Sequence, residues 1–344
     1  MADSQLYSKV PLEVVLHVWE QAMKARGVHH FRVFPKINGV NDQILGIEPW
    51  ATDTDAAKDV STWNHRWTIA HVDHAAYEKY RQWLADTTGQ GALWVAPFRL
   101  KKGQPGKIDE RAKVHAKQDL VVVTFTGIYI NFDFLNIRAT QNQLRGLRSI
   151  GLNWKQTHTG HDWHIIPFMC LCQNKPHAHL KHCPLKIAQF LRLFPDLRHF
   201  YFIYRICAKD IKQSETQTRA RGNISNKGKA VQCKKSGAVI SGRVTKLQPV
   251  KLTANEKIDN TLSALRVYAE KKELEVCSDS ERMFIEVDEK GLERFVDHKG
   301  LLDVMKRLQT AYRAVNRHRS AAQKLELGKA KFHFLVCRDH MSRK

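Results

Sequence analysis

The chain has 344 residues, 43% of them hydrophobic and 26% charged, which is the composition of a globular protein long enough to bury a core. Its 56 Lys and Arg against 34 Asp and Glu leave a net charge of +22. So basic a protein usually binds DNA or RNA; the alternatives are that it binds an acidic protein or that the charge serves solubility alone. No apolar stretch of about eighteen residues predicts a membrane span, and seven irregularly spaced cysteines without a signal-peptide pattern indicate a reducing cytoplasm.

Residues 1–113 are expected to form an N-terminal α/β region. A helix is predicted over 11–26, where apolar residues recur at helical spacing, namely Leu12, Val15, Val18, Trp19 and Met23. A strand is expected over 29–37, a second amphipathic helix over 73–87, and a short β-type run over 91–100.

Residues 114–208 are expected to form a central core that alternates between strands and helices. The expected elements are strands over 118–135, a helix over 139–151, a strand over 162–172, a helix over 184–194 and a strand or buried helix over 197–208. This alternation predicts an α+β fold with a central antiparallel or mixed sheet, RRM-like or palm-like, covered by helices on one face.

Residues 209–251 form a distinct basic segment with eleven Lys and Arg, two acidic residues and no aromatic residue. Such a composition buries too little apolar area to fold alone, so we expect either a flexible segment that contacts phosphates or a plain linker. The predicted nucleic-acid-binding residues are Arg219, Arg221, Lys227, Lys229, Lys234, Lys235, Arg243 and Lys246. Residues 252–344 return to amphipathic patterning and predict a smaller helical or αβ C-terminal part.

A cluster of histidine and cysteine gives the sequence its most specific chemistry. One interpretation is a structural zinc site, whose available ligands are Cys170, Cys172, His177, His179, His182 and Cys183, although paired knuckle spacing is lacking. A second interpretation is a catalytic site for Mg²⁺ or Mn²⁺. In an extended segment His177 and His179 project to one face, and His164 is the expected third ligand.

The motif "PHAHL", with two histidines flanking a hydrophobic residue, resembles the metal motif of HUH endonucleases, the family of replication initiators and relaxases. The resemblance implies a compact α+β palm that nicks single-stranded DNA through a tyrosine, within a plasmid or phage-like element. It assigns Tyr268 as nucleophile with Lys271 on the same helix, in "VYAEKK", and Tyr201 and Tyr204 are substitutes.

A second resemblance is to the palm of archaeo-eukaryotic primases. It is carried by "GIYINFDF" followed by "TGHDWHIIPF", in which Asp133 and His164 match the metal and nucleotide positions. Asn131 replaces the first acid, and Asp288 or Asp297 could supply the third. The remaining alternative is a non-catalytic DNA- or RNA-binding subunit of a nucleoprotein complex, in which the histidines and Trp154 line a nucleic-acid surface.

Overall fold

The computed structural model describes residues 10–37, 43–49, 60–95, 112–125, 135–154, 183–212, 252–298, 300–316 and 330–338. The elements in chain order are α2 (Leu12–Lys24), β1 (Val28–Ile37), β2 (Gln43–Pro49), α3 (Thr62–Ala70), α4 (His74–Gly89), β3 (Leu93–Val95), β4 (Lys113–His115), β5 (Leu120–Phe125), α5 (Ile137–Gln143), β6 (Ser149–Trp154), α6 (Pro184–Leu191), β7 (His199–Ile206), the 3-10 turn η3 (Ala208–Asp210), α8 (Ala254–Lys271), β8 (Val276–Ser278), β9 (Met283–Val287), α9 (Glu289–Phe295), α10 (Leu301–Val315) and β10 (Lys331–Arg338). Among the helices it describes, none combines the length and apolar character needed to cross a membrane.

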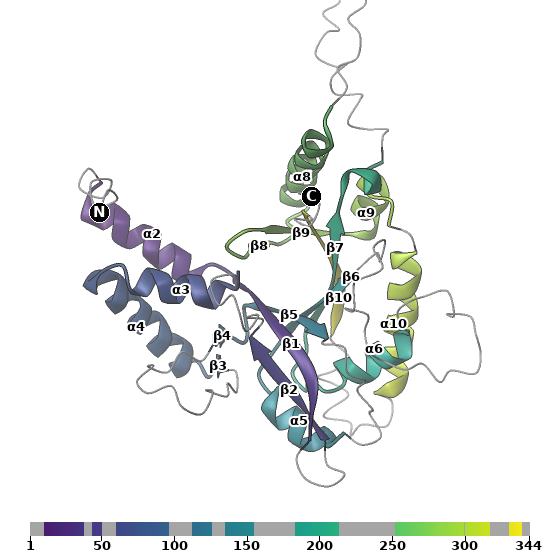
Figure 1. Ribbon diagram of the computed structural model, residues 1–344, viewed down its shortest axis with the longest axis horizontal. Helices are drawn as coiled ribbons and strands as arrows, with labels where there is room; N and C mark the ends of the chain where they lie inside the picture. The colour runs from purple at the N-terminus through teal and green to yellow at the C-terminus, as the bar shows by residue number, and fades with distance from the viewer. Residues whose placement is uncertain are drawn as a thin grey trace, which may run out of the picture.

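Eight strands form one mixed sheet in the order β2-β1-β5-β6-β7-β10-β9-β8 (Figure 1). The five central strands β1, β5, β6, β7 and β10 run parallel to one another, and β2 on one side and β9 and β8 on the other add antiparallel strands. The mixed-sheet α+β fold predicted from the sequence is confirmed. Strands from the expected regions 1–113, 114–208 and 252–344 all join this sheet, and the boundaries between those regions stay a prediction.

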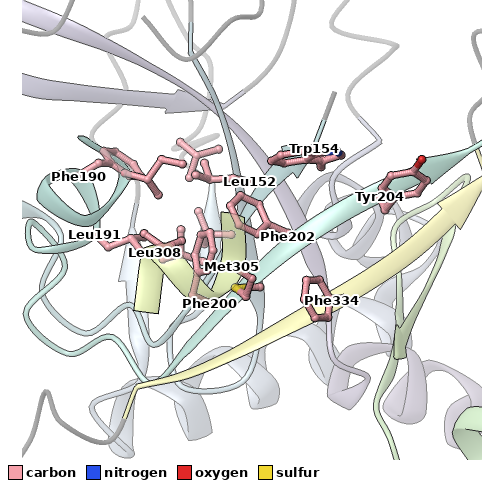
Figure 2. Packing of buried hydrophobic residues seen from close by; sticks show 14 of the residues in the cluster. Leu152, Trp154, Phe190, Leu191, Phe200, Phe202, Tyr204, Met305, Leu308 and Phe334 are labelled. Atoms are coloured by element: carbon pink, nitrogen blue, oxygen red, sulfur yellow. The ribbon is translucent and has the colours of Figure 1, made fainter. Parts of the chain in front are cut away.

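Helices cover one face of the sheet and bury its main core. On this face Phe200, Phe202 and Tyr204 of β7 are at most 1% exposed, and α6 and α10 pack over them (Figures 1 and 2). Trp154 at the end of β6 meets the ring of Phe202 edge to face at 5.5 Å. Such ring pairs stabilise a core beyond the area that they bury.

The opposite face, which we call the inner face, carries a smaller apolar cluster with polar side chains at either end. Its apolar members are Val28, Leu120, Val122, Tyr201, Ile203, Cys277, Phe284, Leu335 and Cys337. A bridge between Gly27, just before β1, and Ser278, the last residue of β8, brings distant strands of the sheet together. The sheet therefore curls around the inner face instead of lying flat.

The helices α2, α3 and α4 form a separate layer beside the start of β1, joined to the sheet by a buried ion network. Asp119 accepts hydrogen bonds from Arg66 (2.7 and 3.2 Å), His29 (2.8 Å) and the backbone N–H groups of Gly27 and His115. Burial alone would raise the pKa of Asp119, but the charge of Arg66 and the bond from His29 outweigh it and hold that pKa well below its usual range.

Local capping chemistry explains where several helices begin. Asp73 accepts a hydrogen bond from the backbone N–H of Ala76 at the start of α4. Thr253 and Glu256 form a reciprocal capping box at the start of α8. Pro184 occupies the first turn of α6, as the sequence predicted, because its fixed φ suits that position.

Two expectations differ from the structure in detail. In α2, Val15, Trp19 and Met23 are buried as expected, whereas Leu12 and Val18 are 60% and 57% exposed because only one side of this helix meets α3 and α4. The helix expected over 139–151 is shorter: α5 ends at Gln143, and the residues from Ser149 belong to strand β6.

Candidate functional site

Most residues that the sequence predicted for chemistry lie outside the described residues. These are the expected metal ligands His164, His177 and His179, the other zinc candidates Cys170, Cys172 and His182, the primase-like Asp133, and the basic residues Arg219, Arg221, Lys227, Lys229, Lys234, Lys235, Arg243 and Lys246. Within the described ranges no group of three His, Cys, Asp or Glu is placed to hold a metal ion. The Mg²⁺, Mn²⁺ and zinc interpretations rest on the other residues and stay predictions.

Tyr268 lies on α8, where its hydroxyl donates a 2.8 Å hydrogen bond to Asp288. Asp288 is the N-cap of α9 and accepts a second bond from the backbone N–H of Gly291. Burial and the bond to Asp288 raise the pKa of the Tyr268 hydroxyl, so the group is protonated at neutral pH and links α8 to α9. Lys271 is exposed at the end of the same helix. Their catalytic roles stay predictions.

The two substitute tyrosines are buried within the sheet. Tyr204 is on the helix-covered face and donates to the backbone oxygen of Asp297 at 2.9 Å. Tyr201 is on the inner face and donates to Glu275 at 3.0 Å. Trp154, expected on a nucleic-acid surface, is instead 8% exposed and packed in the core, because the strand containing it places it on the helix-covered face.

The described residues bring together a different polar group on the inner face, at the level where the parallel strands β5, β6 and β7 end and the longer strand β1 continues past β5. We call it the carboxyl-end row: Arg32 on β1, Thr124 on β5, Asn153 on β6 and Arg205 on β7. Arg32 is the direct partner of Thr124 in the sheet register, and Asn153 is the partner of Ile203. Side chains alternate between faces, so Asn153 and Arg205 share the inner face with Gly151 and Ile203.

The charges of this row are partly neutralised. Arg32 donates through Nε (3.1 Å) and Nη2 (2.9 Å) to one oxygen of Glu48 on β2. A guanidinium has five N–H donors, so these bonds use only part of its capacity. The Arg32 side chain is 33% exposed. The side-chain oxygen of Asn153 is buried without a hydrogen-bond partner among the described residues, which is costly unless another group or water satisfies it.

A second polar group adjoins the row. His30, two residues before Arg32 on the same face, forms a 2.9 Å hydrogen bond to Asp279, which also accepts from Nε of Arg282 at 3.1 Å. Burial lowers the pKa of His30, and the nearby charges of Arg282 and Arg205 lower it further, so His30 is neutral at pH 7. Three arginines, Arg32, Arg205 and Arg282, thus face the region around one buried imidazole.

An arrangement of this kind suits an anionic ligand. Arginine presents several N–H groups in a planar fork that matches phosphate oxygens, and open sheets of parallel strands usually bind ligands at their carboxyl ends. These residues were not predicted from the sequence. The available signal was an arginine in the strand "HHFRVFPKI" and another in "HFYFIYRI", each at an inner-face position of a strand rich in apolar residues.

The comparisons with known proteins add no relative. No protein-family model matches the sequence, and neither the curated proteins nor the solved structures give a significant match.

Proposed function

We propose that the protein is a cytoplasmic nucleic-acid-binding protein that contacts the phosphate backbone, with the carboxyl-end row as one of its anion-binding surfaces. The observation that carries this proposal is the placement of two arginines on the inner face in a chain of net charge +22: Arg205 is near the carboxyl end of β7, and Arg32, in the middle of β1, lies level with the end of β5. Such a charge favours polyanions over long distances, and a guanidinium binds phosphate at close range.

The way the chain leaves the sheet also supports this proposal. β5 ends at Phe125, β6 at Trp154 and β7 at Ile206. Because these strands are parallel, all three finish at the same end of the sheet. The described residues after β7 continue to Lys212 and so include the first residues of the basic segment 209–251. This segment, with eleven Lys and Arg against two acidic residues, therefore begins near the end of the sheet that carries Arg205.

Binding is tested by fluorescence anisotropy with labelled single-stranded DNA, duplex DNA and single-stranded RNA over a range of salt concentrations. We expect the affinity to fall steeply with salt, because cations on the protein displace counterions from phosphates. The double change Arg32→Gln and Arg205→Gln should weaken binding about a hundredfold or more, if each arginine contributes one charge-assisted contact.

The matched control is the double change Arg81→Gln and Arg266→Gln, which removes the same charge from two exposed helix positions. This control should change affinity much less than the change in the row. Equal losses in both variants would reject the row as a binding surface, and the absence of salt-sensitive binding to all three ligands would reject the proposed function.

A narrower proposal rests on the sequence motif alone. In it the protein is a metal-dependent initiator of a plasmid or phage-like element that nicks single-stranded DNA, with His177 and His179 on the metal and Tyr268 as nucleophile. The same oligonucleotides, incubated with Mg²⁺ or Mn²⁺, distinguish the two proposals: label that stays on denatured protein identifies a nicking enzyme, and retention without cleavage identifies a binding protein.

A further inference from the structure

A group of titratable side chains lies at the other end of the inner face, where β7 and β10 begin. Nδ1 of His199 lies 3.2 Å from Nε2 of His333, and Nδ1 of His333 lies 2.5 Å from Oε1 of Glu286 on β9. The Glu286 side chain is 8% exposed and that of His333 is 20% exposed. These three groups form a continuous chain from a buried carboxylate to a half-buried imidazole.

One arrangement of the protons satisfies both hydrogen bonds. The Glu286 carboxylate only accepts, so Nδ1 of His333 carries a proton and donates it. With that proton as the only one on the His333 ring, Nε2 of His333 has a lone pair, which accepts the Nδ1–H of His199. The remaining ring nitrogen, Nε2 of His199, therefore has a lone pair. No other described group bonds to this nitrogen, and it is not fully buried.

The surroundings keep His199 neutral. Burial lowers its pKa to about 4, and the positive charges of Arg26 and Lys331 contribute in the same direction, against the opposing charge of Glu286. The ring of Tyr201 stacks on His333 at 4.9 Å and holds that imidazole in place. Arg26 donates to the Tyr201 hydroxyl at 3.1 Å and pairs with Glu275.

This arrangement matches the general form of an activated nucleophile: an attacking group, a base that takes its proton, and a carboxylate that orients the base. We propose that His199, His333 and Glu286 form a nucleophilic site for a phosphoryl group, separate from the carboxyl-end row. Cationic Arg26 and Lys331 near His199 favour an anionic phosphoryl donor over a neutral electrophile.

The chemical step balances within these groups. Nε2 of His199 forms a bond to phosphorus while the bond from phosphorus to the leaving group breaks, and its electron pair departs with the leaving group. The Nδ1 proton of His199 moves to Nε2 of His333, which leaves the phosphorylated ring neutral. Glu286 stabilises the imidazolium formed on His333, and the leaving group takes a proton from water.

The test uses the full chain and phosphoramidate, a small phosphoryl donor that releases ammonia as the bond between phosphorus and nitrogen breaks. Acid-labile phosphorylation is followed at each histidine by peptide mass spectrometry under neutral conditions. His74, whose side chain is 88% exposed, is the internal reference. We expect His199 to react at least about tenfold faster than His74, a modest part of what a positioned base contributes.

Two variants and one matched control make the test decisive. Glu286→Gln and His333→Gln should reduce the rate at His199 to that at His74, whereas Glu289→Gln, which changes an exposed carboxylate on α9, should leave it unchanged. Unfolding curves show whether each variant is folded. If a variant does not fold, the wild-type protein decides, through the ratio of the rates at His199 and His74. A rate at His199 no faster than that at His74 would overturn the proposal.

Discussion

Arg66 binds both carboxylate oxygens of Asp119, at 2.7 and 3.2 Å, in a place where the two side chains are 2% and 0% exposed. The same guanidinium donates to the backbone oxygen of Ala25 at the end of α2. One ion pair thus connects α3, the end of α2 and the turn before β5. An ion pair so completely removed from water costs much to desolvate, and breaking it leaves a buried charge without compensation.

The first prediction concerns this pair. Arg66→Leu should lower the free energy of unfolding by about 3–5 kcal/mol, because Asp119 would keep a buried negative charge with only His29 and backbone N–H groups beside it. Urea denaturation followed by circular dichroism measures the change. Arg81→Leu, which removes an exposed pair with Glu78, should cost less than about 1 kcal/mol. Similar losses in the two variants would contradict the prediction.

The second prediction concerns pH. Burial lowers the pKa of His29 and of His30 in the folded protein. Below the ordinary imidazole pKa of about 6.5 the unfolded chain binds protons that the folded chain does not, so stability is fully present above that pH and falls as the pH drops. Each such histidine contributes a slope of up to about 1.4 kcal/mol per pH unit. Urea midpoints at several pH values between 5 and 8 measure this dependence.

The variant His30→Gln measures how much His30 alone contributes to the pH dependence of stability. It should flatten the decline in stability below pH 6.5, because glutamine does not titrate and can still donate to Asp279. His74→Gln, at an exposed position, is the control and should leave the slope unchanged. A slope that is the same in His30→Gln as in the wild type would show that His30 is not the group that titrates.

The third prediction concerns Tyr268. If it is the nucleophile of a nicking reaction, Tyr268→Phe should abolish the covalent adduct with labelled DNA while leaving salt-sensitive binding intact. Loss of the bond to Asp288 should also lower the free energy of unfolding by about 1 kcal/mol. Tyr77→Phe changes a tyrosine that is 40% exposed on α4 and serves as the control. An adduct that persists in Tyr268→Phe would assign the chemistry to another residue.

The fourth prediction concerns the basic segment. Residues 213–251 can be exchanged for a Gly/Ser linker of equal length, which keeps the contact between Ile211 and Val296 that anchors the preceding turn. The slope of log affinity against log salt should then become less steep by about 0.9 for each duplex phosphate that the segment neutralises. The unfolding midpoint of the protein should stay the same. An unchanged salt slope would identify the segment as a linker.

Local patterns in the sequence predicted much of the fold because those patterns depend on near neighbours. Each element has a local pattern that follows from the face it buries. The pattern is amphipathic spacing in α8 and α10 and an apolar run in β7, and both are visible in the sequence itself. Strand β6 was missed although Ile150, Leu152 and Trp154 alternate with smaller or polar residues. The helical spacing of the residues before β6, together with Gly151 inside it, made the alternation of buried and smaller side chains in this strand hard to recognise.

The candidate sites were harder to predict because they depend on the order of strands in the sheet. Glu286, His333 and His199 come from three strands, and nothing in their local sequence indicates that β10 lies between β7 and β9. The same holds for Arg32 and Arg205, which are separated by two intervening strands. The predicted histidine motif had a strong local signal, but its residues are outside the described structure, so its chemistry still depends on the sequence alone.

The position of β10 has a consequence for synthesis of the protein. β10 pairs along its full length with β7, yet 124 residues of chain separate the end of β7 from the start of β10. At typical rates of translation this interval lasts on the order of 10 s, during which the strand His199–Ile206 is made but lacks one neighbour. An apolar strand with an open edge is prone to pair with other chains. Ribosome-bound chains that stop before Lys331 should therefore recruit chaperones or aggregate, and chains that include Arg338 should not.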